Sequence, residues 1–134
     1  PQGRGKGRAD DCPDDVENGS REKTKENTAM NIVVFVTAKD KQEAQKIARR
    51  LVEDKLIACA NIVDGVKSVF WWQGKTDEAD ETLLIMKSEK RLFKKIAAAV
   101  KALHSYDIPE VIALPIVDGS ADYLKWMKES LSRK

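Results

Sequence analysis

The chain has 134 residues, a length that corresponds to one domain with its own core. Its 24 basic and 22 acidic residues leave a net charge of +2, which argues against nucleic acid and acidic lipid as partners. The apolar runs are far shorter than the roughly 20 residues that cross a bilayer, and no signal peptide is recognisable. We therefore expect a cytoplasmic protein without membrane attachment.

Residues 1–29 differ in composition from everything that follows. They contain only four apolar residues, too few to offset the entropy of ordering the segment. We expect a disordered or artificial N-terminal extension, followed by one domain over residues 30–134. Cys12 lies in this extension without neighbouring ligand residues, and with Cys59 as the only other cysteine we expect two reduced thiols.

The first half of the domain predicts a strand, a helix and a second strand. "NIVVFVTA" (31–38) is a β-branched run typical of a buried strand. Residues 40–55 follow as a helix, in which Asp40 and Glu43 have the spacing of a capping box. "LIACANIV" is the next strand, and it ends at Asp64-Gly65. The helix carries one apolar stripe, made of Ala44, Ile47, Ala48, Leu51 and Val52.

The second half repeats this unit. "KSVFWWQGK" is extended, Gly74 and "TDEAD" (76–80) predict a turn, and "ETLLIMKS" pairs back as a strand. "EKRLFKKIAAAVKALH" (89–104) is a second amphipathic helix, and "PEVIALPIV" (109–117) is the last strand. "SADYLKWMKESL" closes the chain as a short helix.

The resulting order is β-α-β-β-α-β with an extra C-terminal helix, which predicts a ferredoxin-like α+β sandwich with helices on one face of an antiparallel sheet. The strands are apolar on both faces, and the chain has no further layer to cover the second face. Trp71 and Trp72, adjacent on a strand, point to opposite faces. We therefore predict a homo-oligomer that covers sheet faces and edges.

Four motifs, "LIACANI", "FWWQGK", "LHSYDIPEVIALPI" and "DYLKW", resemble those of the CutA family in order and spacing, over residues 31 to about 131. The resemblance implies a homotrimer in which strands of neighbouring subunits join edge to edge. It also implies a non-enzymatic role in tolerance of divalent metals, copper above all. The family shares its fold and trimer with the PII signalling proteins.

Cys59 and His104 are the candidate metal ligands, because thiolate and imidazole suit Cu(II) and other soft divalent cations. The family's suggested copper site also uses a first-strand cysteine and a second histidine, whose places hold Val36 and Leu103 here. Weak metal binding is therefore expected, with no required cofactor. The structural alternatives are a buried small side chain for Cys59 and a helix-end residue for His104.

The resemblance also implies a cleft between subunits as a binding site. Its candidate residues are Trp72, Lys87, Tyr106, Asp107, Glu110 and Tyr123. The alternative for these side chains is packing at an interface, where tyrosine and tryptophan are common.

Other functions find less support in the residues. The acidic run from Asp77 to Glu81 lacks the spacing of a calcium loop and is expected at a solvated hairpin tip. A single histidine limits acid–base catalysis. A PII-like module that binds small molecules or protein partners in the intersubunit cleft is the alternative function, and a purely structural scaffold is the third.

Overall fold

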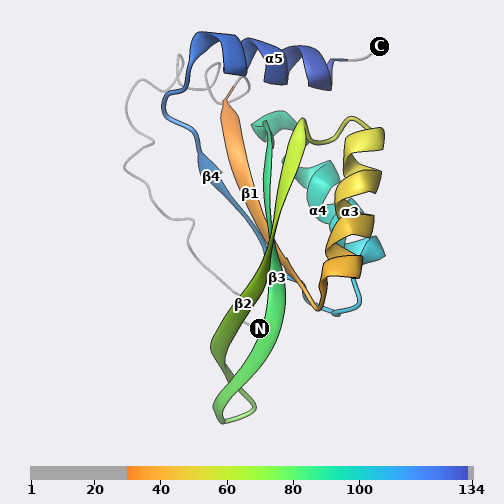
Figure 1. Cartoon of the computed structure of the whole chain (residues 1–134), viewed down its shortest axis with the longest axis vertical. Coiled ribbons are helices and arrows are strands. Elements are labelled where there is room, and N and C mark those ends of the chain that lie inside the picture. The colour runs from red at the N-terminus through yellow and green to blue at the C-terminus, as the bar shows by residue number, and fades with distance from the viewer. Residues whose placement is uncertain (1–29, 133–134) are drawn as a thin grey trace.

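The computed structural model describes residues 30–132. Four strands and three α-helices follow in the order β1, α3, β2, β3, α4, β4 and α5, with a 3₁₀ turn (η2) before α4 (Figure 1). The bounds are β1 Asn31–Ala38, α3 Lys41–Glu53, β2 Cys59–Trp72, β3 Lys75–Glu89, η2 Lys90–Leu92, α4 Phe93–Leu103, β4 Val111–Pro115 and α5 Ala121–Leu131. The expected element order is thus confirmed, whereas the N-terminal extension lies outside the described residues.

The strands form one antiparallel sheet in the order β2-β3-β1-β4. Helices α3 and α4 cover one face of it, and α5 lies across one end (Figure 1). Alternate residues of β1 explain this arrangement, because Ile32, Val34 and Val36 are buried while their neighbours Val33 and Phe35 are only partly covered. The core therefore lies between the sheet and the pair α3–α4.

Helix α3 begins as the sequence predicts. The Asp40 side chain accepts a hydrogen bond from the Glu43 amide at 2.8 Å, which satisfies one of the free donors of the first turn. The apolar stripe is buried except for its last member, Val52, which is 42% exposed. Helix α4 starts later than expected, at Phe93, because residues 90–92 form the 3₁₀ turn.

The prediction for the hairpin between β2 and β3 is wrong in two respects. Strand β2 does not end at Asp64-Gly65, where a register shift between Val63 and Val66 marks a bulge, but runs on to Trp72. The turn is formed by Gln73 and Gly74 alone, and "TDEAD" belongs to β3. The two long strands extend beyond the rest of the sheet as a two-stranded ribbon (Figure 1).

Candidate functional site

The face of the sheet away from α3 and α4, here called the open face, is apolar through its centre. Phe35 of β1 is paired with Ile85 of β3 on one side and with Ile112 of β4 on the other. Ile112 is 50% exposed and Leu114 46% exposed. The apolar side chains of this face are Val33, Phe35, Val63, Leu83, Ile85, Ile112 and Leu114.

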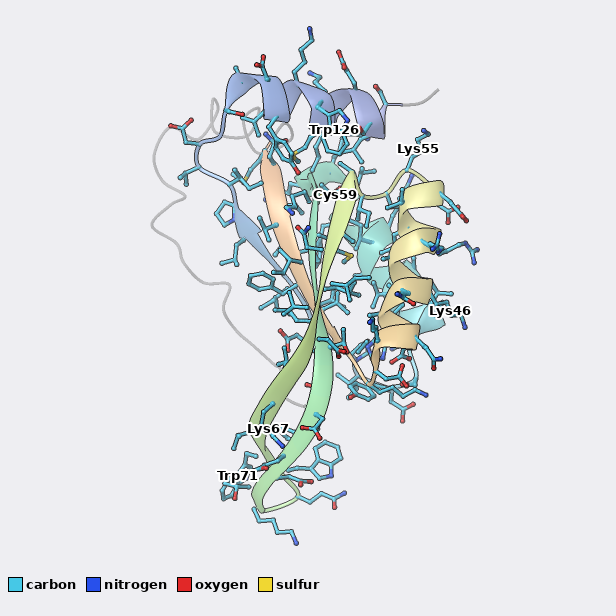
Figure 2. The ribbon with its side chains drawn as sticks, viewed as in Figure 1. Lys46, Lys55, Cys59, Lys67, Trp71 and Trp126 are labelled. Carbon is cyan, nitrogen blue, oxygen red and sulfur yellow. The ribbon has the colours of Figure 1, made fainter. Side chains whose placement is uncertain are left out.

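Cys59 lies on the open face at the start of β2, close to α5 (Figure 2). Its Sγ atom is 3.5 Å from the Lys87 Nζ and 3.5 Å from the Tyr123 hydroxyl. The hydrogen bond with Cys59, followed by burial, raises the pKa of Tyr123 to about 12, so the phenol stays protonated at neutral pH. Lys87 also donates to the Asn61 side-chain oxygen. The thiol is partly exposed, but an ammonium group stands beside it and opposes a bound cation.

His104 has a fully buried side chain at the end of α4. Its Nε2 lies 2.7 Å from the Thr37 carbonyl oxygen, and its Nδ1 accepts a hydrogen bond from the Tyr106 amide at 3.0 Å. Since a carbonyl only accepts, the ring is the neutral tautomer with its proton on Nε2. Both nitrogens are occupied, so a metal ion would have to break one of these bonds to use His104.

Glu43 connects the start of α3 with the segment after α4. Its carboxylate accepts hydrogen bonds from the Lys39 amide (3.0 Å), the Ser105 amide (2.7 Å) and the Ser105 hydroxyl (3.2 Å). Burial by itself would raise the pKa of Glu43, but these hydrogen bonds outweigh it and hold the pKa below its usual value. A cavity of about 330 Å³ lies beside Glu43 and His104. These contacts hold the chain around His104 in place, which is a structural role.

A second polar group lies at the other end of the open face, around Glu81. Glu81 is only 3% exposed, and its two carboxylate oxygens accept hydrogen bonds from the Ser68 hydroxyl (2.5 Å) and the Tyr106 hydroxyl (2.6 Å). Burial and the bond to Glu81 raise the pKa of Tyr106. Burial, and then the charge of Glu81, raise the pKa of Glu110.

The two soft ligands predicted from the sequence are not brought together. Cys59 and Val33 are both paired with Lys87, so Cys59 lies at the same height of the sheet as Val33. His104 instead contacts Thr37, which is four residues further along β1 than Val33. Four residues of strand span about 13 Å. Within residues 30–132, no group of three or more His, Cys, Asp or Glu side chains is placed to hold a metal ion.

The predicted cleft residues fall into separate places within one chain. Lys87 and Tyr123 meet at Cys59, while Tyr106 and Glu110 lie near Glu81, six residues from Lys87 along β3, or about 20 Å. Trp72 lies next to the ribbon turn, and Asp107 is exposed in the loop before β4. One chain thus carries parts of the predicted cleft at opposite ends of the open face.

Glu81 is a functional candidate that the sequence interpretation missed. The predicted strand "ETLLIMKS" begins at Glu81, and the structure confirms that this residue lies in β3. The prediction that Glu81 belongs to a solvated hairpin tip is wrong, because the residue is buried. The alternation Glu81, Leu83, Ile85 along one strand was the available signal, since residues two apart share a face.

Comparison with known proteins gives relatives along almost the whole described chain. The family described as CutA1 divalent ion tolerance protein matches residues 32–130. The divalent-cation tolerance protein CutA of Thermus thermophilus is 45% identical over 101 residues, which are 75% of this chain and 98% of that protein. The chloroplastic protein CutA 1 of Oryza sativa is 44% identical over 111 residues, covering 83% of this chain but only 63% of the rice protein.

Solved structures of CutA1 proteins from the same two organisms share the fold. The crystal structure of CutA1 from Oryza sativa has a TM-score of 0.76 at 44% identity and covers 81% of this chain and 99% of that one. The structure of Cut A1 from Thermus thermophilus has a TM-score of 0.75 at 44% identity, with coverage of 77% and 100%. Sequence and fold agree, and the chain belongs to the CutA1 family of divalent ion tolerance proteins.

Proposed function

We propose that this chain forms a non-enzymatic homotrimer that acts in tolerance of divalent metals, copper among them, with weak metal binding. Membership of the divalent ion tolerance family over residues 32–130 is the observation that carries the metal role. The half-exposed apolar side chains of the open face, such as Ile112 and Leu114, support assembly, because contiguous apolar surface is stabilised by burial.

Cys59 is the first copper ligand in this proposal. Thiolates favour copper over hard cations, and the Cys59 thiol is partly exposed, whereas both nitrogens of His104 are engaged. The ammonium of Lys87, 3.5 Å from the sulfur, makes the proposed site weak, since it must move away before a cation binds.

The non-enzymatic part of the proposal is supported by His104 as well. It is the sole histidine of the chain, and its engaged nitrogens leave no imidazole free as a general base. Within residues 30–132 no helix is long and apolar enough to cross a membrane. A cytoplasmic location stays a prediction.

Copper titration by calorimetry tests the proposed ligands, with Cys12→Ser as the background so that one thiol is left. We expect Cys59→Ser to abolish measurable binding. Lys87→Gln removes the neighbouring charge and should strengthen binding up to about fivefold, the effect of a charge pair near the surface. His104→Gln tests whether His104 is a copper ligand in addition to Cys59. An unchanged copper affinity in this variant would show that His104 is not part of the site. Copper binding that survives in Cys59→Ser would contradict the assignment.

A PII-like binding module is the second candidate. The observation in its favour is the group of polar side chains around Glu81 at the end of an otherwise apolar face. A thermal-shift panel of nucleotides and metabolites discriminates the two, because the metal proposal expects a shift with copper and none with the organic ligands.

A further inference from the structure

Three polar side chains lie at one end of the open face, on β3, on the neighbouring β1 and just before β4, which flanks β1 on its other side. Thr37 is paired with Leu83, and the pairing of Val36 with Val111 puts Glu110 beside Thr37. Glu81 precedes Leu83 by two residues, so it points to the same face as Leu83 and Thr37. We call Glu81, Thr37 and Glu110 the acid row.

The Glu81 carboxylate is held in one orientation. Ser68 donates to one oxygen and Tyr106 to the other, and Glu81 is 3% exposed. Each carboxylate oxygen accepts more than one bond, so both retain a lone pair for a further partner. Carboxylates that bind metal ions are typically oriented by such hydrogen bonds.

Thr37 provides an independent sign that a partner belongs here. Its side chain is 6% exposed, and its Oγ1 is the one buried side-chain oxygen or nitrogen within residues 30–132 that lacks a hydrogen bond. Its nearest acceptor is the Glu110 carboxyl, and this contact lowers the pKa of Glu110 in part, although its geometry is poorer than that of a normal hydrogen bond. Buried hydroxyls in folded proteins nearly always have a partner.

The charge of the acid row is not balanced within the described part of the chain. Among residues 30–132, neither Glu81 nor Glu110 forms an ion pair with a lysine, arginine or histidine. Two neighbouring carboxylates in a poorly solvated place repel each other, and a cation between them would remove that repulsion.

We propose that the acid row binds a hard divalent cation such as Mn²⁺ or Mg²⁺ through carboxylate oxygens of Glu81 and Glu110 and the hydroxyl of Thr37. Hard cations prefer oxygen ligands, and Mg²⁺ is usually held by one or two carboxylates while keeping several water molecules. The three protein ligands leave room for such water. This site is separate from the soft site proposed at Cys59 and takes a different class of ion.

Mn²⁺ binding to the full chain, followed by electron paramagnetic resonance of the free ion, tests the site. We expect Glu110→Gln, which keeps the shape of the side chain, to weaken Mn²⁺ binding by about tenfold or more. Thr37→Val should leave the metal-free protein folded, since only the poorly aligned contact with Glu110 is lost, and should also weaken binding. Asp107→Asn is the matched control, because this exposed acid lies outside the row.

The outcomes are decisive. Mn²⁺ affinity that falls in Glu110→Gln and Thr37→Val but is unchanged in Asp107→Asn supports the site. An unchanged affinity in Glu110→Gln, or no binding by the wild-type chain at millimolar Mn²⁺, overturns it. The Cys59→Ser variant should bind Mn²⁺ like the wild type, so failure of the copper proposal is distinguishable from failure of this one.

Discussion

Glu43 connects the start of α3 to the segment after α4 by hydrogen bonds. Three donors from Lys39 and Ser105 converge on its carboxylate, and His104 lies beside it with its Nδ1 3.9 Å from a Glu43 oxygen. The sequence interpretation expected a capping box, in which Glu43 would reach back to Asp40. In the structure the carboxylate instead binds the amide of Lys39 and crosses to Ser105, because a tertiary partner competes with the local one.

Glu43→Gln should destabilise the fold by about 1–3 kcal/mol, since charged hydrogen bonds are replaced by neutral ones at a buried position. The folded-state pKa of Glu43 lies below the usual value of 4.5, so its ionised form stabilises the fold above pH 4.5, and this contribution is lost as the pH falls through the folded pKa. Urea unfolding of both chains at neutral and acid pH measures the difference. The exposed Glu53→Gln is the control, and an equal loss in both variants would refute the role of the buried contacts.

The ribbon of β2 and β3 is the element that the sequence described least well. Its turn consists of Gln73 (φ 51°) and Gly74 (φ 83°), both in the left-handed region that a two-residue hairpin of the I′ type requires. The acidic residues that follow are paired with β2, as in the ion pair of Lys67 and Asp80 at 2.8 Å. Cross-strand pairing therefore outweighs the turn preference of an acidic run.

Substitutions in the turn should act through the backbone. Gln73→Gly relieves a left-handed conformation and should stabilise the ribbon by about 0.5–1 kcal/mol, whereas Gly74→Ala should destabilise it by about 1 kcal/mol. A Cβ on Gly74 would have no atom within 4 Å, so steric contact cannot account for a loss. Hydrogen exchange of the amides paired at Trp72 and Lys75 reports the change. Faster amide exchange in Gln73→Gly than in the wild type would show that the backbone of Gln73 is not strained.

At the scale of the whole molecule, the open face is the surface through which we expect the chain to assemble with other copies. Helices cover one side of the sheet only, and the other side exposes Ile112 and Leu114. Near the ribbon turn the two indoles are exposed as well, Trp71 to 69% (Figure 2). Such a surface is stabilised when another copy covers it. The polar side chains at the two ends of the open face, around Cys59 and around Glu81, would then lie at the rim of the interface between copies.

Ile112→Glu should break the assembly, because a buried carboxylate without a partner opposes association. Light scattering of the wild-type chain should give three times the chain mass of 15.0 kDa, and the variant a smaller mass. Ala98→Glu, on the exposed side of α4, should leave the mass unchanged. A wild-type mass of a single chain would contradict the proposed trimer.

The sequence by itself determined the order of the elements, the N-cap of α3 and the apolar character of both sheet faces, because these depend on residues close together in the chain. It also placed Cys59 on a strand and His104 at a helix end. Only the tertiary structure decided that His104 has no free nitrogen and that Glu81 is buried. The first property depends on the contact of His104 with Thr37, 67 residues away, and the second on the contact of Glu81 with Tyr106, 25 residues away. Contacts between residues so distant in the chain have no signature in the local sequence.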